Sequence, residues 1–359
     1  MDQVSPARAW VSTATSIGIM LSRGMSMDRS DWITDLGWAR EDCYAQAMEQ
    51  IVLPYLRGIR RDTQVSGYGA RPLMCAQYDA QDPRGTVLIL HGFTECIEKY
   101  AEVVYAFLTA HYSVVIYDQR GHGQSWRAEG LSDPSVTHVD SFSDYVVDME
   151  RVCVNVLHHM PRPWIVFAHS MGGAVAAFYL EKHKNTFDKA ILCAPMIAPH
   201  RSGAPYLLTR LMCRVANATG KKKKRAFITK PYAGREKFET SCATSRARFD
   251  WFEDMRAQNP HMQNNGPTYG WTMEALGVTQ RLLMPRAVER IECPVRLYMA
   301  EKDTSVIPHA ERMFIRRVKG GTFTQVAGSK HEIYRSTDDV IGPWWQDILH
   351  FLENNNRST

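Results

Sequence analysis

Strand-like and helical segments alternate along the middle of the chain, and this alternation limits the folds open to it. The β-branched pattern of buried strands occurs in TVLILHG (86–92), SVVIYDQRGHGQS (113–125), PWIVFAHS (163–170) and DKAILCAP (188–195). Segments with helical spacing lie between them at 98–111, 142–160 and 171–183. Strands joined by helices are typical of a parallel sheet covered on both faces. The sequence therefore predicts a doubly wound α/β protein.

The alternation stops after Pro195 and resumes at CPVRLYMAEKD (293–303). A doubly wound sheet that is interrupted after its middle strand is the layout of an α/β-hydrolase with an inserted helical cap. We expect four parts: an N-terminal helical extension (1–58), the first part of the core (59–198), a basic cap (199–285) and the second part of the core (286–359). Helical signals at 41–57 precede an expected strand pair at 59–79. The stretch ARAWVSTATSIGIML (7–21) is interpreted as a structural or interfacial helix and not as an export signal.

Ser170 lies where the strand of FAHSMGGAV (167–175) meets the following helix. A sharp turn there would lift the serine hydroxyl above the sheet, and it requires small residues two positions before and after the serine. Ala168 and Gly172 meet this requirement, although Ala168 replaces the first glycine of the Gly-x-Ser-x-Gly pattern. The pattern predicts that Ser170 is a nucleophile.

A nucleophilic serine needs a base and an acid, which follow it along the chain in this fold. Asp303 ends the strand segment LYMAEKD and is the predicted acid, with Glu301 as the competing carboxylate. His331, in VAGSKHEIY after the last strand, is the predicted base.

The oxyanion donors should be backbone N–H groups beside the nucleophile and in the loop after the first parallel strand. These are the N–H groups of Met171 and of Phe93, which ends the segment LILHGF. His91 is expected to order that loop. Asp118 and His122, in DQRGHGQS, are expected to hold a turn, since this segment lacks a phosphate-binding motif.

The basic residues of the chain are concentrated in its cap. Residues 200–249 carry 13 Lys or Arg side chains against two Asp or Glu, whereas the rest has 30 against 36. The cluster KKKKR comprises Lys221, Lys222, Lys223, Lys224 and Arg225, and we expect it to bind an anionic substrate or membrane surface. A nucleic-acid partner is not favoured, because no recognition motif or interleaved aromatic residue accompanies the run.

Composition excludes several other classes of protein. The eight cysteines form no C-x-x-C pair and the histidines have no metal-binding spacing, so we expect neither a metal nor another cofactor. No apolar run is long enough to span a bilayer. Reduced thiols favour a cytoplasmic location, with peripheral contact at the inner membrane face. Nothing in the sequence indicates the oligomeric state.

Two sets of segments carry a resemblance to a known family. HGFTECIEKYAE, DQRGHGQS, AHSMGGA and APM resemble the serine hydrolases that include monoacylglycerol lipases and bacterial lysophospholipases. HVDSFSDYVVD, TSRARFDW and GPTYGW are similar to the lysophospholipase L2 type, and the last two lie in the cap. The resemblance covers roughly residues 59–352. It implies cofactor-free hydrolysis of the acyl ester of a single-chain lipid, with Ser170, Asp303 and His331 as the triad and Ala168 as a family variant.

Three alternative functions remain at this point. A general short-chain esterase would use the same triad. A proline-releasing aminopeptidase of the same fold would need carboxylates to hold the substrate ammonium, and the cap has few. A non-catalytic binding protein that retains the fold is disfavoured, because the serine, acid and histidine are all present in the expected order.

Overall fold

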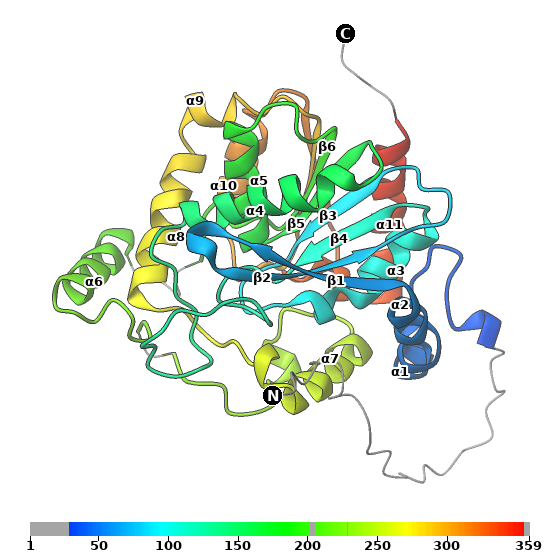
Figure 1. Cartoon of the computed structure of the whole chain (residues 1–359), viewed down its shortest axis with the longest axis horizontal. Coiled ribbons are helices and arrows are strands. Elements are labelled where there is room, and N and C mark those ends of the chain that lie inside the picture. Colours follow the sequence, from blue (N-terminus) through cyan, green and yellow to red (C-terminus); the bar gives the residue numbers. More distant parts are fainter. Residues whose placement is uncertain (1–28, 201–204, 228, 355–359) are drawn as a thin grey trace, which may run out of the picture.

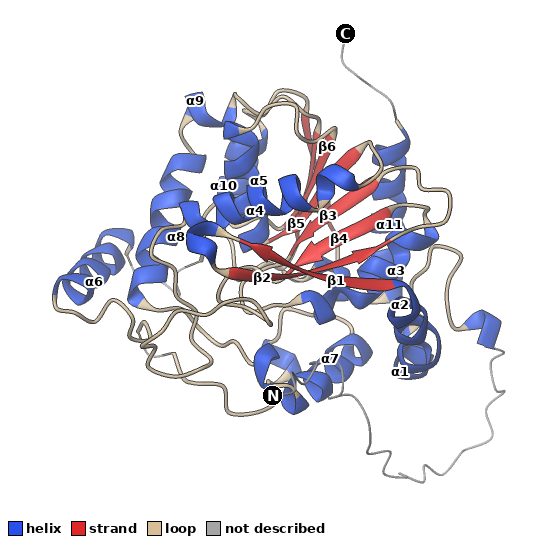
Figure 2. Cartoon of the chain, in the orientation of Figure 1, coloured by secondary structure: helices blue, strands red, loops and turns tan. Residues whose placement is uncertain are grey.

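The computed structural model describes residues 29–200, 205–227 and 229–354, and in these residues eight strands form one sheet (Figures 1 and 2). The strands are β1 (Arg60–Ser66), β2 (Pro72–Tyr78), β3 (Thr86–Leu90), β4 (Ser113–Tyr117), β5 (Trp164–His169), β6 (Lys189–Cys193), β7 (Val295–Ala300) and β8 (Gly321–Val326). Their order is β1-β2-β4-β3-β5-β6-β7-β8. β2 pairs antiparallel with β1 and β4, and the other pairs are parallel. The predicted doubly wound sheet and the strand pair at 59–79 are confirmed.

Helices cover both faces of the sheet. One face packs against α3 (Ala101–Thr109), α11 (Asp338–Glu353) and the N-terminal α1 (Tyr44–Ala47) and α2 (Leu53–Ile59), which a π-helical turn (Met48–Val52) joins. The other packs against α4 (Ser143–Asn155), α5 (Met171–Lys182) and α10 (Pro308–Ile315). Side chains of β3 alternate between the two cores: Leu88 and Leu90 join one, Val87 and Ile89 the other. This two-sided burial explains why a central strand such as β3 is fully buried and almost entirely apolar, whereas the edge strands β1 and β8 are largely polar.

The segment between β6 and β7 forms a helical cap. Its elements are α6 (Tyr206–Ala218), α7 (Arg246–Gln258), α8 (Tyr269–Leu282) and the short α9 (Pro285–Val288). α8 packs against α5 of the core and carries α6 on its other side, so that α6 lies at the outer edge of the molecule (Figure 1). α7 lies at a different place, against α1.

A buried arginine fastens α7 to the core. The side chain of Arg248 is fully buried and forms ion pairs with Glu102 of α3 and Asp338 of α11, both at 2.9 Å. Its guanidinium also donates to the carbonyl of Ala39 at 2.7 Å. Removing one partner of a buried ion pair leaves the other charge without compensation, which costs about 3–5 kcal/mol. This part of the cap is therefore fixed to the core and the N-terminal segment.

The described part of the N-terminal extension belongs to the core. Trp38, Tyr44 and Met48 are buried among side chains of α3 and α11. The helix expected at 7–21 lies outside the described residues. Among the residues that are described, no helix is both long enough and apolar enough to cross a membrane.

Candidate active site

Ser170 occupies a strained turn between β5 and α5. Its backbone has φ 50° and ψ −116°, a left-handed conformation that a non-glycine residue adopts at a cost of about 1–3 kcal/mol. The turn is crowded: a Cβ at Gly172 would lie 2.4 Å from the carbonyl oxygen of Leu90, and one at Gly173 would lie 2.6 Å from Cβ of Pro195. Ala168 is fully buried. The serine thus sits on the sharp strand-to-helix turn that the sequence predicts.

His331 connects Ser170 to Asp303. Its Nε2 lies 2.9 Å from the Oγ of Ser170, and its Nδ1 lies 2.8 Å from Oδ2 of Asp303. Burial alone would raise the pKa of Asp303, but the hydrogen bond and charge of His331 lower it below its usual value. An ionised carboxylate only accepts hydrogen bonds, so the neutral imidazole carries its proton on Nδ1 and presents a lone pair at Nε2 to the serine hydroxyl.

The loop after β7 places the two candidate carboxylates, Asp303 and Glu301, in different surroundings. Oδ1 of Asp303 accepts the backbone N–H groups of Ser305 (2.7 Å) and Val306 (3.0 Å), which orient the carboxylate toward His331. Glu301 is exposed, and its side chain accepts the N–H of Gly328 on the surface instead. The geometry therefore favours Asp303 over Glu301 as the partner of the histidine.

His91 orders the loop after β3, as predicted. Its Nε2 accepts the backbone N–H of Gln119 at 2.9 Å, so its Nδ1 carries the proton and donates to the carbonyl of Gly92 at 2.8 Å. Burial lowers the pKa of His91 to about 4, and the ring is neutral. Phe93 lies two residues after His91 and lines the active-site cavity.

The predicted turn at DQRGHGQS is also confirmed. The carboxylate of Asp118 accepts the backbone N–H groups of Ile97 (2.9 Å) and Gln124 (2.8 Å). This turn connects to the His91 loop through Gln119. Met171, the second predicted oxyanion donor, is the first residue of α5, where the helix N-terminus favours negative charge.

A cavity of about 740 Å³ opens over the Ser170 hydroxyl. Ser170 and His331 lie in its wall, and much of the rest is apolar: Phe93, Met196, Phe227, Trp271, Leu276 and Val306. The rings of Phe93 and Trp271 are in contact, with centroids 4.2 Å apart. Cavities of this size and composition are typical of sites for small organic ligands. The walls come from both the core and the cap.

The basic cluster at 221–225 precedes Phe227, which lines the cavity, and its five side chains differ in their contacts. Lys221 and Lys224 are exposed. The other three bind the loop at 129–140: Lys222 pairs with Asp140 (2.8 Å), Lys223 donates to the carbonyl of Glu129 (2.8 Å) and Arg225 pairs with Asp133 (2.6 Å). Within the described part of the chain, the cavity wall includes none of the five.

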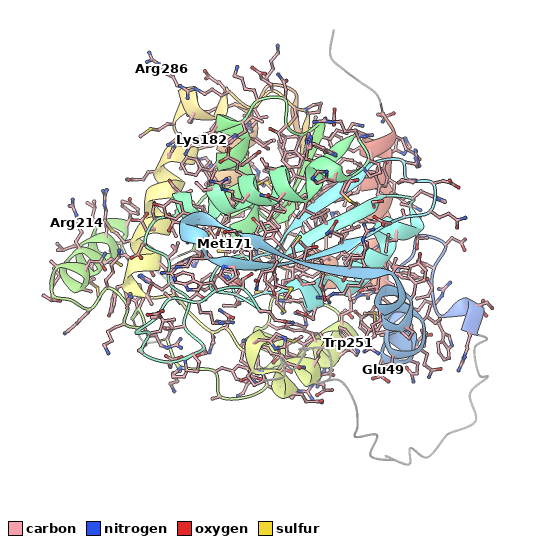
Figure 3. The ribbon with its side chains drawn as sticks, in the orientation of Figure 1. Glu49, Met171, Lys182, Arg214, Trp251 and Arg286 are labelled. Carbon is pink, nitrogen blue, oxygen red and sulfur yellow. The ribbon has the colours of Figure 1, made fainter. Side chains whose placement is uncertain are left out.

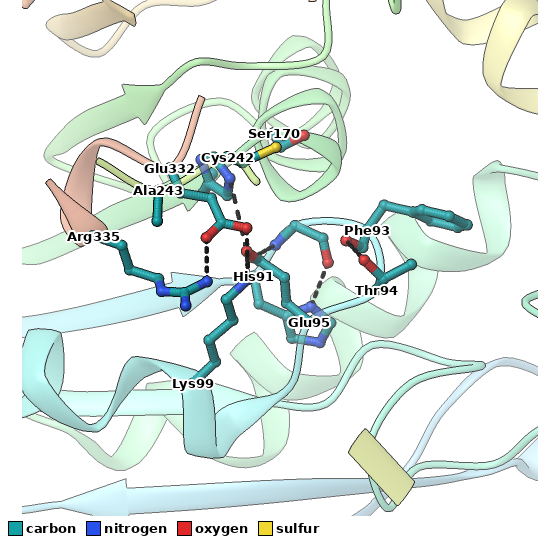
Figure 4. Close-up of polar contacts among 12 residues, drawn as sticks. His91, Phe93, Thr94, Glu95, Lys99, Ser170, Cys242, Ala243, Glu332 and Arg335 are labelled. Carbon is teal, nitrogen blue, oxygen red and sulfur yellow. Dashed lines mark hydrogen bonds and ion pairs between the residues drawn. The ribbon is translucent and has the colours of Figure 1, made fainter. Parts of the chain in front are cut away.

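A buried group of charged residues beside the triad was not identified from the sequence. It consists of Glu95, Lys99, Glu332 and Arg335, and Figure 4 shows it next to Ser170. Two signals were available: Glu95 and Lys99 have the i, i+4 spacing of a helical ion pair, and Glu332 follows His331 directly. The pattern gave no sign that the two pairs meet.

Other reactive side chains are dispersed. Among the described residues, no group of three or more His, Cys, Asp or Glu side chains could hold a metal ion. All eight cysteines lie in the described ranges, and they are free thiols.

The sheet, the cap and the Ser170 turn together define an α/β-hydrolase. The chain belongs to the Hydrolase_4 family (serine aminopeptidase, S33), whose model matches residues 81–338. It is 27% identical over 343 residues to lysophospholipase L2 of Escherichia coli (strain K12), which covers 92% of this chain and 97% of the relative. It is 26% identical over 274 residues to the probable lysophospholipase L2 of Haemophilus influenzae, with 75% and 84% covered.

The fold is also that of a solved lipase structure. A soluble variant of monoglyceride lipase from Saccharomyces cerevisiae, in complex with a substrate analogue, superposes with a TM-score of 0.64. The likeness covers 82% of this chain and 94% of that chain at 20% identity. At this identity the comparison supports the α/β-hydrolase fold.

Proposed function

We propose that this protein is a serine carboxylester hydrolase that cleaves the acyl ester of single-chain lipids, lysophospholipids or monoacylglycerols, through an acyl-enzyme. The observation that carries the proposal is the hydrogen-bonded series Ser170–His331–Asp303 at the wall of a largely apolar cavity. The names of the relatives from Escherichia coli and Haemophilus influenzae support the same substrate class.

The geometry supports a two-step reaction. His331 Nε2 takes the proton of the Ser170 hydroxyl as its Oγ bonds to the acyl carbon. The N–H groups of Phe93 and Met171 are the proposed donors to the resulting oxyanion. The imidazolium, held by Asp303, then gives its proton to the leaving glycerol oxygen as the ester bond breaks. Water repeats the sequence on the acyl-enzyme and releases the fatty acid.

An aminopeptidase is the competing function within the family. Two carboxylates, Glu95 and Glu332, do line the cavity, although both belong to the core and not to the cap. Lys99 lies within 3.0 Å of Glu95 and 2.6 Å of Glu332. Both carboxylates are therefore already neutralised by an internal cation. The arrangement does not favour a substrate ammonium, which would compete with Lys99.

The outer face of α6 is our proposed contact with an anionic membrane. Its apolar side chains project outward: Leu207, Leu208, Leu211, Met212 and Val215 are 76%, 50%, 57%, 43% and 54% exposed. The face that is turned inward holds Thr209, Cys213 and Ala216. A contiguous exposed apolar face of this kind marks a protein or lipid contact site.

Charge and position favour a lipid surface over a protein partner. Arg214 projects from α6 at the edge of the molecule (Figure 3), and the exposed Lys221 and Lys224 follow the helix. Amphipathic helices with apolar and basic side chains lie at the boundary of anionic bilayers. Thr209 of α6 and Phe227, which follows the basic cluster, both line the cavity. A lipid bound at this surface would therefore lie near the cavity. With eight unpaired cysteines in support, we place this contact at the cytoplasmic membrane face.

The nucleophile is tested by Ser170→Ala. We expect ester hydrolysis and labelling by a fluorophosphonate to fall by about 10⁴-fold or more, with the fold intact. Ser336→Ala is the matched control, because Ser336 is also buried but lies two residues before α11 and outside the triad. Comparing lysophospholipid, p-nitrophenyl esters of varied chain length and proline p-nitroanilide separates the three enzyme classes. Turnover of the anilide alone would contradict the proposal.

The membrane contact is tested by replacing Leu207, Leu211 and Val215 together with Ser. Binding to phosphatidylglycerol vesicles should fall by about tenfold or more, and lysophospholipid turnover with it, while hydrolysis of p-nitrophenyl butyrate should stay within about twofold. Val154→Ser is the control, since Val154 is 59% exposed on α4, away from the cap. Replacing Lys221 and Lys224 with Gln should weaken binding only at low salt. Unchanged vesicle binding in the triple variant would refute this contact.

A further inference from the structure

Glu95 lies beside the triad and accepts hydrogen bonds from four groups. Its Oε2 accepts the backbone N–H of Gly92 at 2.5 Å and the hydroxyl of Tyr100 at 2.7 Å. Its Oε1 accepts the hydroxyl of Tyr334 at 2.6 Å and the ammonium of Lys99 at 3.0 Å. The side chain is 3% exposed. A carboxylate with this many fixed donors has one orientation, so it can in turn fix the groups that bind it.

The bond to Gly92 lies one residue before the proposed oxyanion donor. The carboxylate of Glu95 takes the N–H of Gly92 and so fixes the peptide plane between His91 and Gly92. The next peptide carries the Phe93 N–H, and its carbonyl accepts from Nδ1 of His91 at 2.8 Å, so both planes of the loop are held. The approach depends on glycine: a Cβ at residue 92 would lie 2.8 Å from Oε2 of Glu95 and 2.9 Å from Cδ2 of His169. We infer that Glu95 is a positioning residue that aims the Phe93 N–H at the oxyanion. This inference rests on the proposed ester hydrolysis.

Ion pairs also connect Glu95 to the loop that carries His331. Lys99 bridges Glu95 to Glu332, and Glu332 pairs with Arg335 at 2.5 Å (Figure 4). Glu332 is the residue after His331, and its backbone N–H donates to the carbonyl of Cys242 in the cap at 3.0 Å. One alternating series of charges thus joins the oxyanion loop, the base and the cap.

The carboxylates of this series are ionised at neutral pH. Burial by itself would raise the pKa of Glu95, but the charge of Lys99 lowers it well below its usual range. Burial opposes ionisation of Glu332 as well, and Lys99 and Arg335 lower its pKa to about 2. His169, which lies 3.8 Å from Glu95, has its pKa lowered to about 4 by burial and stays neutral. Lys99 is therefore the principal counter-ion of Glu95.

A purely structural role for Glu95 is the alternative, and Glu102 provides a matched control. Glu102 is also buried, and it also accepts a backbone N–H (Ala39, 3.0 Å), a tyrosine hydroxyl (Tyr44, 3.1 Å) and a cation (Arg248). Its partners lie in the N-terminal segment and in α7, away from the oxyanion loop. Glu95→Gln and Glu102→Gln should therefore both lower the melting temperature. Only Glu95→Gln should alter the chemistry.

The experiment compares both variants with the wild type on a soluble p-nitrophenyl ester. Glu95→Gln cannot accept from both Gly92 and Lys99, so we expect kcat to fall by about 10–100-fold while KM changes by less than about threefold. Affinity for a trifluoromethyl ketone, which forms an oxyanion on Ser170, should weaken by the same factor as kcat/KM. Glu102→Gln should leave both quantities unchanged.

The outcomes separate this inference from the proposed function. A Glu95→Gln variant with normal kcat, or with a loss in KM alone, overturns the positioning role while the hydrolase assignment stands. Loss of kcat without loss of ketone affinity also overturns it, because the oxyanion contact would then be intact. A wild-type chain that hydrolyses no ester and resists a fluorophosphonate overturns the proposed function itself.

Discussion

Apolar side chains are buried at the nucleophile turn around Ser170 but exposed on the outer face of the cap helix α6. The residues that flank Ser170 are tightly packed: Ala168 and Met171 are fully buried, and Gly172 has no room for a methyl group. On α6 the apolar side chains face solvent, with Leu207 76% exposed. The first arrangement fixes a strained backbone. The arrangement on α6 leaves an apolar surface in contact with water, which is unfavourable unless a partner outside the described residues covers it.

The difference shows which part of the molecule is built for chemistry and which for contact. A strained φ persists only where the surrounding packing holds it, and the core provides that packing at Ser170. α6 packs on α8 through a narrow inner face and carries no catalytic group. Substitutions in the core turn should therefore alter rate and stability together, while those on the outer face of α6 should alter neither in solution.

The largest expected effect beyond loss of the nucleophile itself is that of Asp303→Asn. The amide can present its NH₂ to His331, which favours the wrong tautomer, and kcat should fall by about 10³–10⁴-fold. Glu301→Gln is the matched control and should retain nearly full activity, because the side chain of Glu301 is exposed and accepts the N–H of Gly328. Steady-state kinetics on one soluble ester decides between them. If Glu301→Gln is the inactive variant, the assignment of the acid is wrong.

Gly172→Ala tests how tightly the turn after Ser170 packs against the end of β3. The new Cβ would lie 2.4 Å from the carbonyl of Leu90 and 2.6 Å from that of His91, so the strand and helix must separate. We expect about a hundredfold loss in kcat/KM and about 1–3 kcal/mol lower stability. Gly277→Ala, in α8 of the cap, has nothing within 4 Å of its Cβ and should be slightly stabilising. Similar losses in both variants would remove the contrast between core and cap.

Substitution of one leucine in the core and one on α6 compares how much each region contributes to stability. Leu192 of β6 is fully buried, and Leu192→Ala should lower the free energy of unfolding by about 2–5 kcal/mol. Leu211 on α6 is 57% exposed, and Leu211→Ala should change it by no more than about 0.5 kcal/mol. Urea unfolding followed by circular dichroism gives both values. A large loss at Leu211 would mean that the outer face of α6 is covered in solution.

The last expected effect is one of pH on stability and concerns Glu311, near Asp303 in the core. Burial raises its pKa from 4.5 to about 9, and neither carboxyl oxygen has a hydrogen-bond partner among the described residues. Between these pH values the folded chain holds a proton that the unfolded chain releases, so stability falls as pH rises. Glu311→Gln should flatten this dependence of the melting temperature between pH 5 and 8.5. Parallel pH profiles for the two proteins would show that Glu311 is ionised when folded.

Much of the sheet and of the site was predictable because both follow from local rules. Ser170, Asp303 and His331 each end or follow a strand, and chain order assigned them to three positions that meet in space. The acid was the least determined, since Asp303 and Glu301 differ by only two positions. The backbone N–H groups that orient Asp303, from Ser305 and Val306, come from the shape of its loop.

The series Glu95–Lys99–Glu332–Arg335 and the anchor Arg248 were not predictable, because their partners are distant in sequence. Arg248 meets Glu102 across 146 positions, and Lys99 meets Glu332 across 233. Nothing in the spacing of charges distinguishes these buried residues from solvated ones. For the basic cluster the sequence was misleading in the other direction. Five consecutive basic residues suggest a single exposed basic surface, but Arg225 is largely buried against Asp133.

The sequence by itself determined the alternation of strands and helices, the small residues around Ser170 and the order of the triad. Each of these depends on neighbours within a few positions, where steric limits and periodicity act directly. Only the tertiary structure decided which side of α6 is covered and which charges are paired. A periodic pattern shows that a helix has an apolar face, but burial depends on what packs against that face. At α6 the packing places Thr209, Cys213 and Ala216 inward and leaves the leucines at the surface.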